Sequence, residues 1–456
     1  MNLKTHFILI ALAWSGVAGS VSSANSNNAH QSLHLDWLDK SVHPGENFYL
    51  YANGNWMKNN PIPPDYASWG SFNVLNEKVQ NLVHKMLQQA AANPHATAGS
   101  IQQKVGDFYY SGMDEQSINK LGIAPLKPEF ARIESVQNLT QLQEEIAHLH
   151  RMGVDVFFSF GSMQDFKRSE EMIAAAFQGG LGLPDRDYYL KDTAKFARIR
   201  QAYVEHIEKM LQLLGEPKAA AQQNAKIIMA IETRLAQISM TQVAQRDPHA
   251  IYHIVDKAQL EQMTPNFSWV NYFKARELPQ LKTINMGMPE FFKGLNTLLQ
   301  EVSIADWRTY MRWHLLDSFA AYLSSPFVEQ NFKMSQSLTG TEKMLPRWKR
   351  VVATENAALG FAIGKMYVDK YFSPESKQQA LEILKNIRYV LSNDIQQLSW
   401  MTPDTRKAAL KKLDLMEERV GYPSKWWDYS TLIIDRGPYV LNVLRANQFL
   451  VKRDLD

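Results

Sequence analysis

The sequence predicts a mainly α-helical protein that contains one small β-hairpin. Long segments repeat apolar residues every three or four positions, which gathers them on one face of a helix. Several of these segments begin with Ser or Thr followed by Pro, a pair that caps and opens helices. Two short apolar runs near residue 160 are long enough only for strands and stand close enough to pair with each other.

The first ordered segment is expected to be extended. An aromatic run at Asn47–Trp56 is followed by the prolines of Pro61–Pro64. Tandem prolines cannot continue a helix, so we expect this segment to lie in extended form on another part of the protein. Asn76–Gln89, in contrast, is expected to be helical because its valines and leucines share one face.

The hairpin is expected at Val154–Phe160 and Met172–Phe177, around the polar connection Gln164–Arg168. The glycine-rich run Gly179–Asp185 after it is expected to be a loop.

Most of the remaining chain is expected to be helical. One long helix is predicted between Ser373-Pro374 and Thr402-Pro403, where leucines and isoleucines keep a period of 3.6 residues. The period is carried by Leu381, Leu384, Ile387, Leu391, Ile395 and Leu398. The other expected helices cover about 193–214, about 219–241 and 355–371, and a last one starts near Pro438.

Composition excludes several classes of protein. The 456 residues carry 49 Lys+Arg and 46 Asp+Glu, a formal net charge of +3, which gives no reason to expect a nucleic-acid partner. The chain has no cysteine, which excludes disulfides, thiol nucleophiles and cysteine-bound metal within it.

The N-terminus has the pattern of a secretory signal peptide at residues 1–24. Lys4 precedes the apolar run Phe7–Trp14, and small residues lead to a cleavage position after Ala24. The run is short for a membrane span, so an uncleaved anchor is the less favoured alternative. We therefore expect residues 25–34 to form a flexible N-terminus and the protein to be exported, to the periplasm or secreted, with no membrane contact after cleavage.

No histidine pattern predicts a metal site. A helical zinc site needs two His residues one turn apart with a Glu beside the first. The pairs His30/His34 and His249/His253 have this spacing, but Gln31 and Ala250 stand where the Glu is needed. The sequence contains neither HExxH nor HxxEH, and we assign no catalytic, cofactor-binding or metal-binding residue.

Two further motifs are expected to be structural. Gly360–Met366 resembles a phosphate-binding loop, but it is one residue short and ends in Met instead of Ser or Thr, so we expect a helix. Arg347–Arg350 is an isolated basic stretch with one Trp, which we expect to be a solvated helix start or an interface anchor.

Several longer strings occur in a characteristic order along the chain. They are NFYLYANGNW (47–56), PIP (61–63), GDFYYSGMD (106–114), GLPDRDYY (182–189), RWHLL (312–316), PRWKR (346–350), ALG (358–360), and KLD (412–414) with VGYP (420–423). Taken together, this set resembles the neprilysin family of zinc metalloendopeptidases in its bacterial, disulfide-free form. The resemblance extends over about Leu35 to Phe449.

The resemblance implies a helical protein of two lobes around a chamber in which oligopeptides are cleaved. It implies a segment at 35–100 that packs on the catalytic lobe, a lid lobe at 101–345, and a linker with the start of the catalytic lobe at 346–456. In the family the zinc ligands lie C-terminal to these positions. We therefore expect an N-terminal portion with an incomplete catalytic lobe, zinc in the full-length family but not bound specifically by this chain, and no activity alone.

Two other roles remain open from the sequence. The chain could bind peptides or a partner without catalysis, or it could be one half of a split peptidase that a separate C-terminal fragment completes.

Overall fold

The computed structural model describes residues 34–455, so the expected signal peptide, His30 and most of the expected flexible N-terminus lie outside the described residues. The described chain is mostly helical and contains a small sheet, which confirms the predicted fold class. Contacts divide it into two compact units. Unit 1 comprises Ala91–Met344 and the described part of Ser430–Asp456, and unit 2 comprises the described part of Asn2–Ala90 and Leu345–Tyr429. The lobe boundaries expected at residues 100 and 345 stay predictions.

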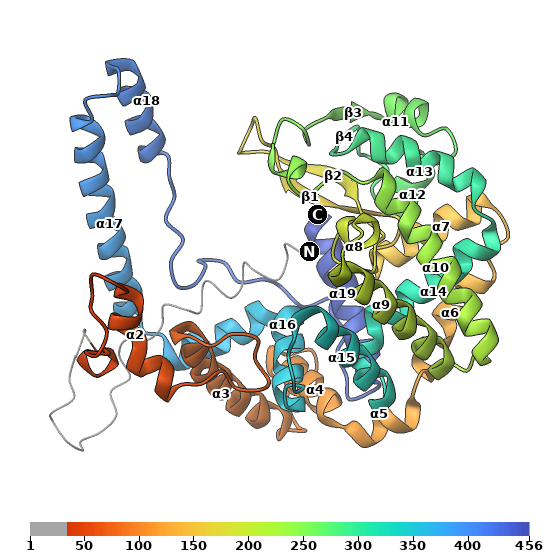
Figure 1. Ribbon diagram of the computed structural model, residues 1–456, viewed down its shortest axis with the longest axis horizontal. Helices are drawn as coiled ribbons and strands as arrows, with labels where there is room; N and C mark the ends of the chain where they lie inside the picture. Colours follow the sequence, from red (N-terminus) through yellow and green to blue (C-terminus); the bar gives the residue numbers. More distant parts are fainter. Residues whose placement is uncertain (1–33, 456) are drawn as a thin grey trace. The chain divides into compact units, whose positions relative to one another are not determined.

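Unit 2 is built from helices that the N-terminal and late parts of the chain supply together (Figure 1). Its helices are α2 (Phe48–Asn59), α3 (Ser71–Ala91), α16 (Arg347–Tyr371), α17 (Pro374–Gln397) and α18 (Pro403–Asp414), with the short 3-10 helix η2 (Leu35–Trp37). Ser373 and Thr402 cap α17 and α18 through their side chains, as their sequence signals predicted.

The expectation of an extended segment at Asn47–Trp56 was wrong, because this segment is helix α2. The Asn47 side chain caps the helix by accepting from Leu50 N at 3.0 Å, which outweighs the poor helix propensity of the aromatic residues. Gly54 allows α2 to pack closely, since a Cβ there would lie 2.7 Å from Asp39 Cβ. The prolines after Asn60 do stand outside any helix.

Unit 1 is larger and combines helices with one sheet. Its α-helices are α4 (Ile101–Met113), α5 (Glu115–Leu121), α6 (Lys127–Glu134), α7 (Leu139–Arg151), α8 (Asp187–Leu190), α9 (Ala194–Leu213), α10 (Lys218–Ile238), α11 (Lys257–Met263), α12 (Trp269–Ala275), α13 (Pro289–Glu301), α14 (Ile304–Phe319), α15 (Ser325–Thr339) and α19 (Tyr439–Leu455). Its 3-10 helices are η3 (Ala124–Leu126), η4 (Ala244–Arg246) and η5 (Ala320–Tyr322).

The sheet has four strands in the order β1-β2-β4-β3. The hairpin expected from the sequence is present, and its strands β1 (Phe158–Gln164) and β2 (Met172–Gln178) pair antiparallel. Its first strand begins at Phe158 rather than Val154, because Phe157 has a left-handed φ of 59° that interrupts extended backbone. Two short strands, β3 (Ile254–Asp256) and β4 (Thr283–Met286), extend the sheet and had no strand signal in the sequence.

Aromatic packing forms the core of unit 1. Its fully buried side chains include Trp269, Trp307 and Trp313, and Phe158 lies in a cluster of rings against Trp269 at a centroid separation of 5.5 Å. Helix α9 packs against α10, α14 and α15, and α10 also packs against α14 (Figure 1). No helix among residues 34–455 is both long and apolar enough to cross a membrane.

Candidate functional site

The described residues do not assemble a metal site. Within residues 34–455, no three His, Asp or Glu side chains lie close enough together to hold an ion. Of the described histidines with helical spacing, His34 stacks on Trp37 at a centroid separation of 4.2 Å and His249 lies in an exposed turn. His253 lies beside Asn285, whose Oδ1 accepts from the His253 backbone N–H at 2.7 Å. Zinc therefore does not fit the described residues, and we derive no chemical step through it.

The two histidines of α7 are structural. His148 Nε2 lies 2.6 Å from Glu129 Oε2, while His150 points the other way into the core. His150 Nε2 donates to Val156 O at 2.8 Å, so its Nδ1 accepts from Tyr272 OH at 2.7 Å. Burial, reinforced by the Arg276 cation, lowers the pKa of His150 to about 3.

Glu232 of α10 is the centre of a buried polar cluster in unit 1. Its carboxylate, which is 0% exposed, accepts from Tyr189 OH at 2.6 Å and from Tyr203 OH at 2.9 Å. His314 Nε2 lies 3.0 Å from the same carboxylate, and Trp313 Nε1 donates to Tyr203 OH at 2.9 Å. Burial, and next the Glu232 charge, raise the pKa of both tyrosines well above the ordinary value, so they remain hydrogen-bond donors.

This cluster holds the glycine-rich loop that the sequence predicted at Gly179–Asp185. Leu183 N donates to Tyr189 OH at 2.8 Å, and Tyr310 OH donates to Gly180 O at 2.8 Å. A Cβ at residue 182 would lie 1.8 Å from Tyr203 Oη, so only glycine fits there. Buried hydrogen bonds thus fix the loop to α8 and α14, and Tyr189 links it further to Glu232 of α10.

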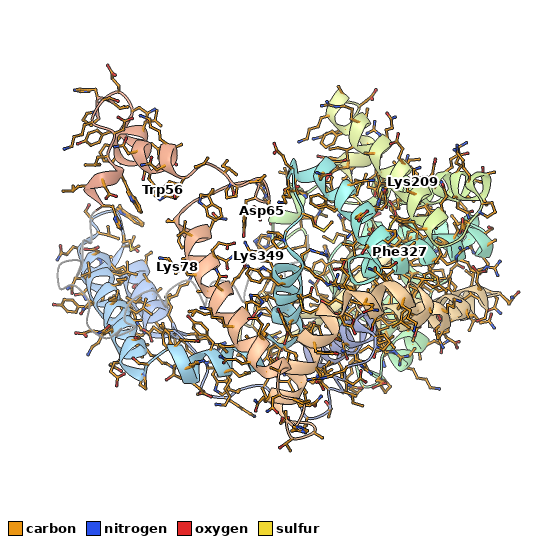
Figure 2. All side chains as sticks on the ribbon, turned by 90° about the horizontal axis from the view of Figure 1, so that it is seen from below. Trp56, Asp65, Lys78, Lys209, Phe327 and Lys349 are labelled. Atoms are coloured by element: carbon orange, nitrogen blue, oxygen red, sulfur yellow. The ribbon has the colours of Figure 1, made fainter. Side chains whose placement is uncertain are left out.

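A second polar cluster lies in unit 2, at the start of α16 (Figure 2). Lys349 Nζ lies 2.5 Å from Glu77 Oε1 on α3, and Tyr66 OH donates to the same oxygen. Burial opposes the Lys349 charge, but the hydrogen bonds to Glu77 and Tyr66 outweigh it and raise the pKa of Lys349. Trp348 stacks on His84 at a centroid separation of 4.2 Å. The basic stretch Arg347–Arg350 is therefore an anchor within unit 2 rather than a solvated helix start.

Glu355, two turns further along α16, is buried without a partner. Its side chain is 0% exposed, and neither carboxyl oxygen makes a hydrogen bond with a described residue. Burial raises the pKa of Glu355 well above its ordinary value. Four residues later the helix is interrupted, since Leu359 has non-helical angles of φ −124° and ψ 23°.

The last described segment is bound tightly within unit 1. The buried Lys104 ammonium donates to Leu432 O, and Arg436 Nε lies 2.7 Å from Asp107 Oδ1. Further along, Asn442 Nδ2 donates to Ser111 Oγ at 2.9 Å. Helix α4 supplies these partners, and Asp107 and Ser111 belong to one string of the resemblance, residues 106–114. This string therefore helps to attach α19 and the segment before it.

Helix α17 of unit 2 exposes a row of apolar side chains. Ile387 is 55% exposed and Val390 is 54% exposed, and Ile395 is its one buried residue. Ile383 and Leu391 add to the same exposed row. The helix packs mainly against α18 (Figure 1). A protein rarely leaves so many neighbouring apolar side chains in water, so this row is a candidate binding surface.

Three comparisons relate the chain to known proteins. The profile described as "Peptidase family M13" matches residues 44–423. Endothelin-converting enzyme 1 of Bos taurus is 30% identical over 406 residues, which cover 86% of this chain and 53% of that protein. The zinc metalloprotease Zmp1 of Mycobacterium tuberculosis, in complex with an inhibitor, superposes with a TM-score of 0.88 and 31% identity, over 92% of this chain and 64% of that one. PepO of Lactobacillus rhamnosis HN001, at 19% identity, TM-score 0.77 and coverage of 91% and 66%, is similar in fold.

These similarities define a metallopeptidase fold and confirm the resemblance stated from the sequence. The chain belongs to peptidase family M13, the neprilysin family. It spans about half the length of the curated relatives it matches.

Sequence reasoning missed the central residues of the buried clusters. Glu232 gave no signal, since a glutamate within a long helix is ordinarily exposed. Glu355 did leave a signal, because it stands one turn before Leu359, Ile363 and Tyr367 on the face that the apolar period defines. A charged residue on that face indicates a buried polar group.

Proposed function

We propose that this chain is the N-terminal portion of an exported zinc endopeptidase that hydrolyses oligopeptides, and that it does not hydrolyse them alone. The family match over residues 44–423 carries the proposal. The relatives include an endothelin-converting enzyme and a zinc metalloprotease, which supports peptide hydrolysis with zinc. The absence of HExxH from the 456 residues supports inactivity, because neither zinc ligands nor a general base would be at hand.

In this role the chain supplies structure instead of chemistry. The Glu232 cluster would hold one loop of unit 1 rigid, and the Lys349 cluster would fix the start of α16 in unit 2. The exposed row of α17, Ile383 to Leu391, would pack against a zinc-bearing segment that completes the peptidase. The same row is the observation that favours the alternative, a non-catalytic chain that binds a peptide or another partner.

A hydrolysis assay tests the proposal. We expect the purified chain to leave a fluorogenic unstructured peptide intact and to carry far less than one zinc per chain. We expect a fusion to the part of Zmp1 that this chain does not cover to gain hydrolysis that a chelator abolishes. Chelator-sensitive turnover by the chain alone would overturn the proposed inactivity.

Variants of α17 separate the two roles. Ile387→Lys places a charge in the exposed row, whereas Lys385→Glu changes a charge that is already exposed. If the row packs against a zinc-bearing segment, the first substitution abolishes hydrolysis by the fusion and the second does not. Tight peptide binding by the zinc-free chain that Ile387→Lys abolishes would favour the non-catalytic alternative.

The proposed export has its own test. Residues 1–24 have the composition of a signal peptide, so we expect the mature chain to begin after Ala24 and to be found in the periplasm. N-terminal sequencing of the fractionated protein measures both.

A further inference from the structure

We propose that the protonation state of Glu355 controls the local stability of helix α16. The neutral carboxylic acid fits the folded unit, whereas the carboxylate destabilises the helix around it. The proposal concerns unit 2 alone and does not rest on the proposed peptidase function.

The first support is the surroundings of the side chain. Glu355 is 0% exposed and lies on the same helix as Val351 and Val352, each 3% exposed, and the fully buried Leu359. Both carboxyl oxygens lack a hydrogen-bond partner among the described residues. An unpaired carboxylate in such a place is far more costly than a neutral acid, because an ion loses much more hydration on burial.

The charged groups of the neighbouring elements do not offset this cost. On α3, which contacts the start of α16, Glu77 is engaged by Lys349, and His84 stacks on Trp348. On α16 itself, Lys365 pairs with Asp369 at 3.0 Å. Lys370 Nζ lies 3.5 Å from Gln89 Oε1 of α3. The segment at 426–427 carries no charge, and its two tryptophans pack against Phe361 of α16. Burial is the one resolved cause that acts on Glu355.

The second support is the break in the helix. Leu359, four residues after Glu355, has φ −124° and ψ 23°, so the backbone is irregular one turn from the buried acid. An irregular turn opens at a lower free energy than regular helix, and opening is the route by which water reaches an ionising group.

The direction of the pH effect follows from proton linkage. The ordinary pKa of this side chain is 4.5, and the folded-state pKa lies well above it. Between these two values the folded state holds more protons than the unfolded state, so stability falls as pH rises. Each pH unit in that window raises the equilibrium constant for opening up to about tenfold, and below pH 4.5 the effect vanishes.

Hydrogen exchange of the full chain at about pH 6 and about pH 9 tests the proposal, as both values lie above the ordinary pKa of a carboxyl group. Glu355→Gln keeps the shape but cannot ionise, and Glu355→Leu also removes the polar group. Glu382→Gln, on the exposed side of α17, is the matched control. Comparing variants at the same pH cancels the chemical pH dependence of exchange. A second readout is the infrared carbonyl band of a protonated carboxylic acid.

We expect exchange of peptides from 347–371, relative to Glu355→Gln, to rise with pH in the wild type and in Glu382→Gln. The acid band should be present in these two proteins and lost in Glu355→Gln. Glu355→Leu should behave as Glu355→Gln does, which keeps the test valid if the amide fits poorly. Equal pH dependence in wild type and Glu355→Gln, or no acid band in the wild type, would overturn the proposal.

Discussion

Two helices of similar length show how differently the two units use their apolar residues. Helix α10 in unit 1 buries seven residues, from Ala221 to Ala236, including the carboxylate of Glu232. Helix α17 in unit 2 has an equally regular apolar period but buries Ile395 alone. The period therefore specifies a helix in both cases, whereas burial depends on whether other elements cover the face.

The same contrast holds for the largest side chains. Almost all of the largest side chains that are fully buried lie in unit 1, where tryptophan and tyrosine rings pack against one another. In unit 2, Tyr429 and Tyr367 are buried, but Trp400 and Tyr389 are about two-thirds exposed or more. Unit 1 thus has a large aromatic core of its own, while the described part of unit 2 leaves more of its large apolar side chains exposed.

The largest expected effect comes from removing one tryptophan in each unit. Trp307 is 0% exposed and packs on Phe157 at a centroid separation of 4.4 Å, so Trp307→Ala should cost about 3–5 kcal/mol. Trp400 is 71% exposed, so Trp400→Ala should change stability by less than about 0.5 kcal/mol. Denaturant unfolding of the 456-residue chain measures both. Similar losses from the two substitutions would contradict the contrast between the units.

A smaller effect is expected from adding a methyl group in each unit. Gly182→Ala would place a Cβ 1.8 Å from Tyr203 Oη, and the buried tyrosine cannot move away without breaking its bond to Glu232. Such overpacking should cost about 1–3 kcal/mol. Gly364 lies within α16, and a Cβ there meets Trp426 at an ordinary 3.6 Å.

Gly364→Ala should therefore stabilise unit 2 by about 0.5–1 kcal/mol, because alanine favours helix. The two substitutions should shift the thermal midpoint in opposite directions. A gain in stability from Gly182→Ala would show that the glycine-rich loop is not held against Tyr203 in the way described.

Local patterns predicted most of the helices, because a capping residue and an apolar period involve only residues that are close together in the sequence. The starts of α17 and α18 and the hairpin at β1 and β2 were predicted in this way. Strands β3 and β4 were not, since each is only three or four residues long and pairs with a distant segment. Helix α2 was also missed: a cap at Asn47 and the contact of Gly54 with Asp39 outweigh an aromatic composition that favours strands.

The polar clusters were beyond local patterns for a related reason. Glu232 meets Tyr189, Tyr203 and His314, which come from three other elements far along the chain. No spacing rule links residues that only the folded unit brings together. The resemblance to a family did point to the string at 182–189, which covers the end of this loop and most of α8, but it did not say which buried carboxylate the string contacts.

The last comparison is between a buried base and a buried acid. His150 in unit 1 is neutral, with its pKa lowered to about 3 from 6.5, whereas Glu355 in unit 2 is the neutral acid discussed above. Below pH 6.5 the His150 side chain binds a proton in the unfolded state but not in the folded state. The free energy of unfolding therefore falls as pH falls from 6.5 towards 3. The expected loss is at most about 1.4 kcal/mol for each pH unit in this window.

His150→Gln should remove this acid sensitivity of unit 1, whatever its effect on stability at neutral pH. His95→Gln, at an exposed position of the same unit, is the control and should leave the pH slope unchanged. Hydrogen exchange of peptides from α7 and α12 at about pH 7 and about pH 5, on either side of the ordinary histidine pKa, measures the slope. Since acid weakens unit 1 through His150 and alkali weakens unit 2 through Glu355, the same pH step should change protection in opposite directions in the two units. Parallel changes in both would mean that these two buried groups do not determine the pH response.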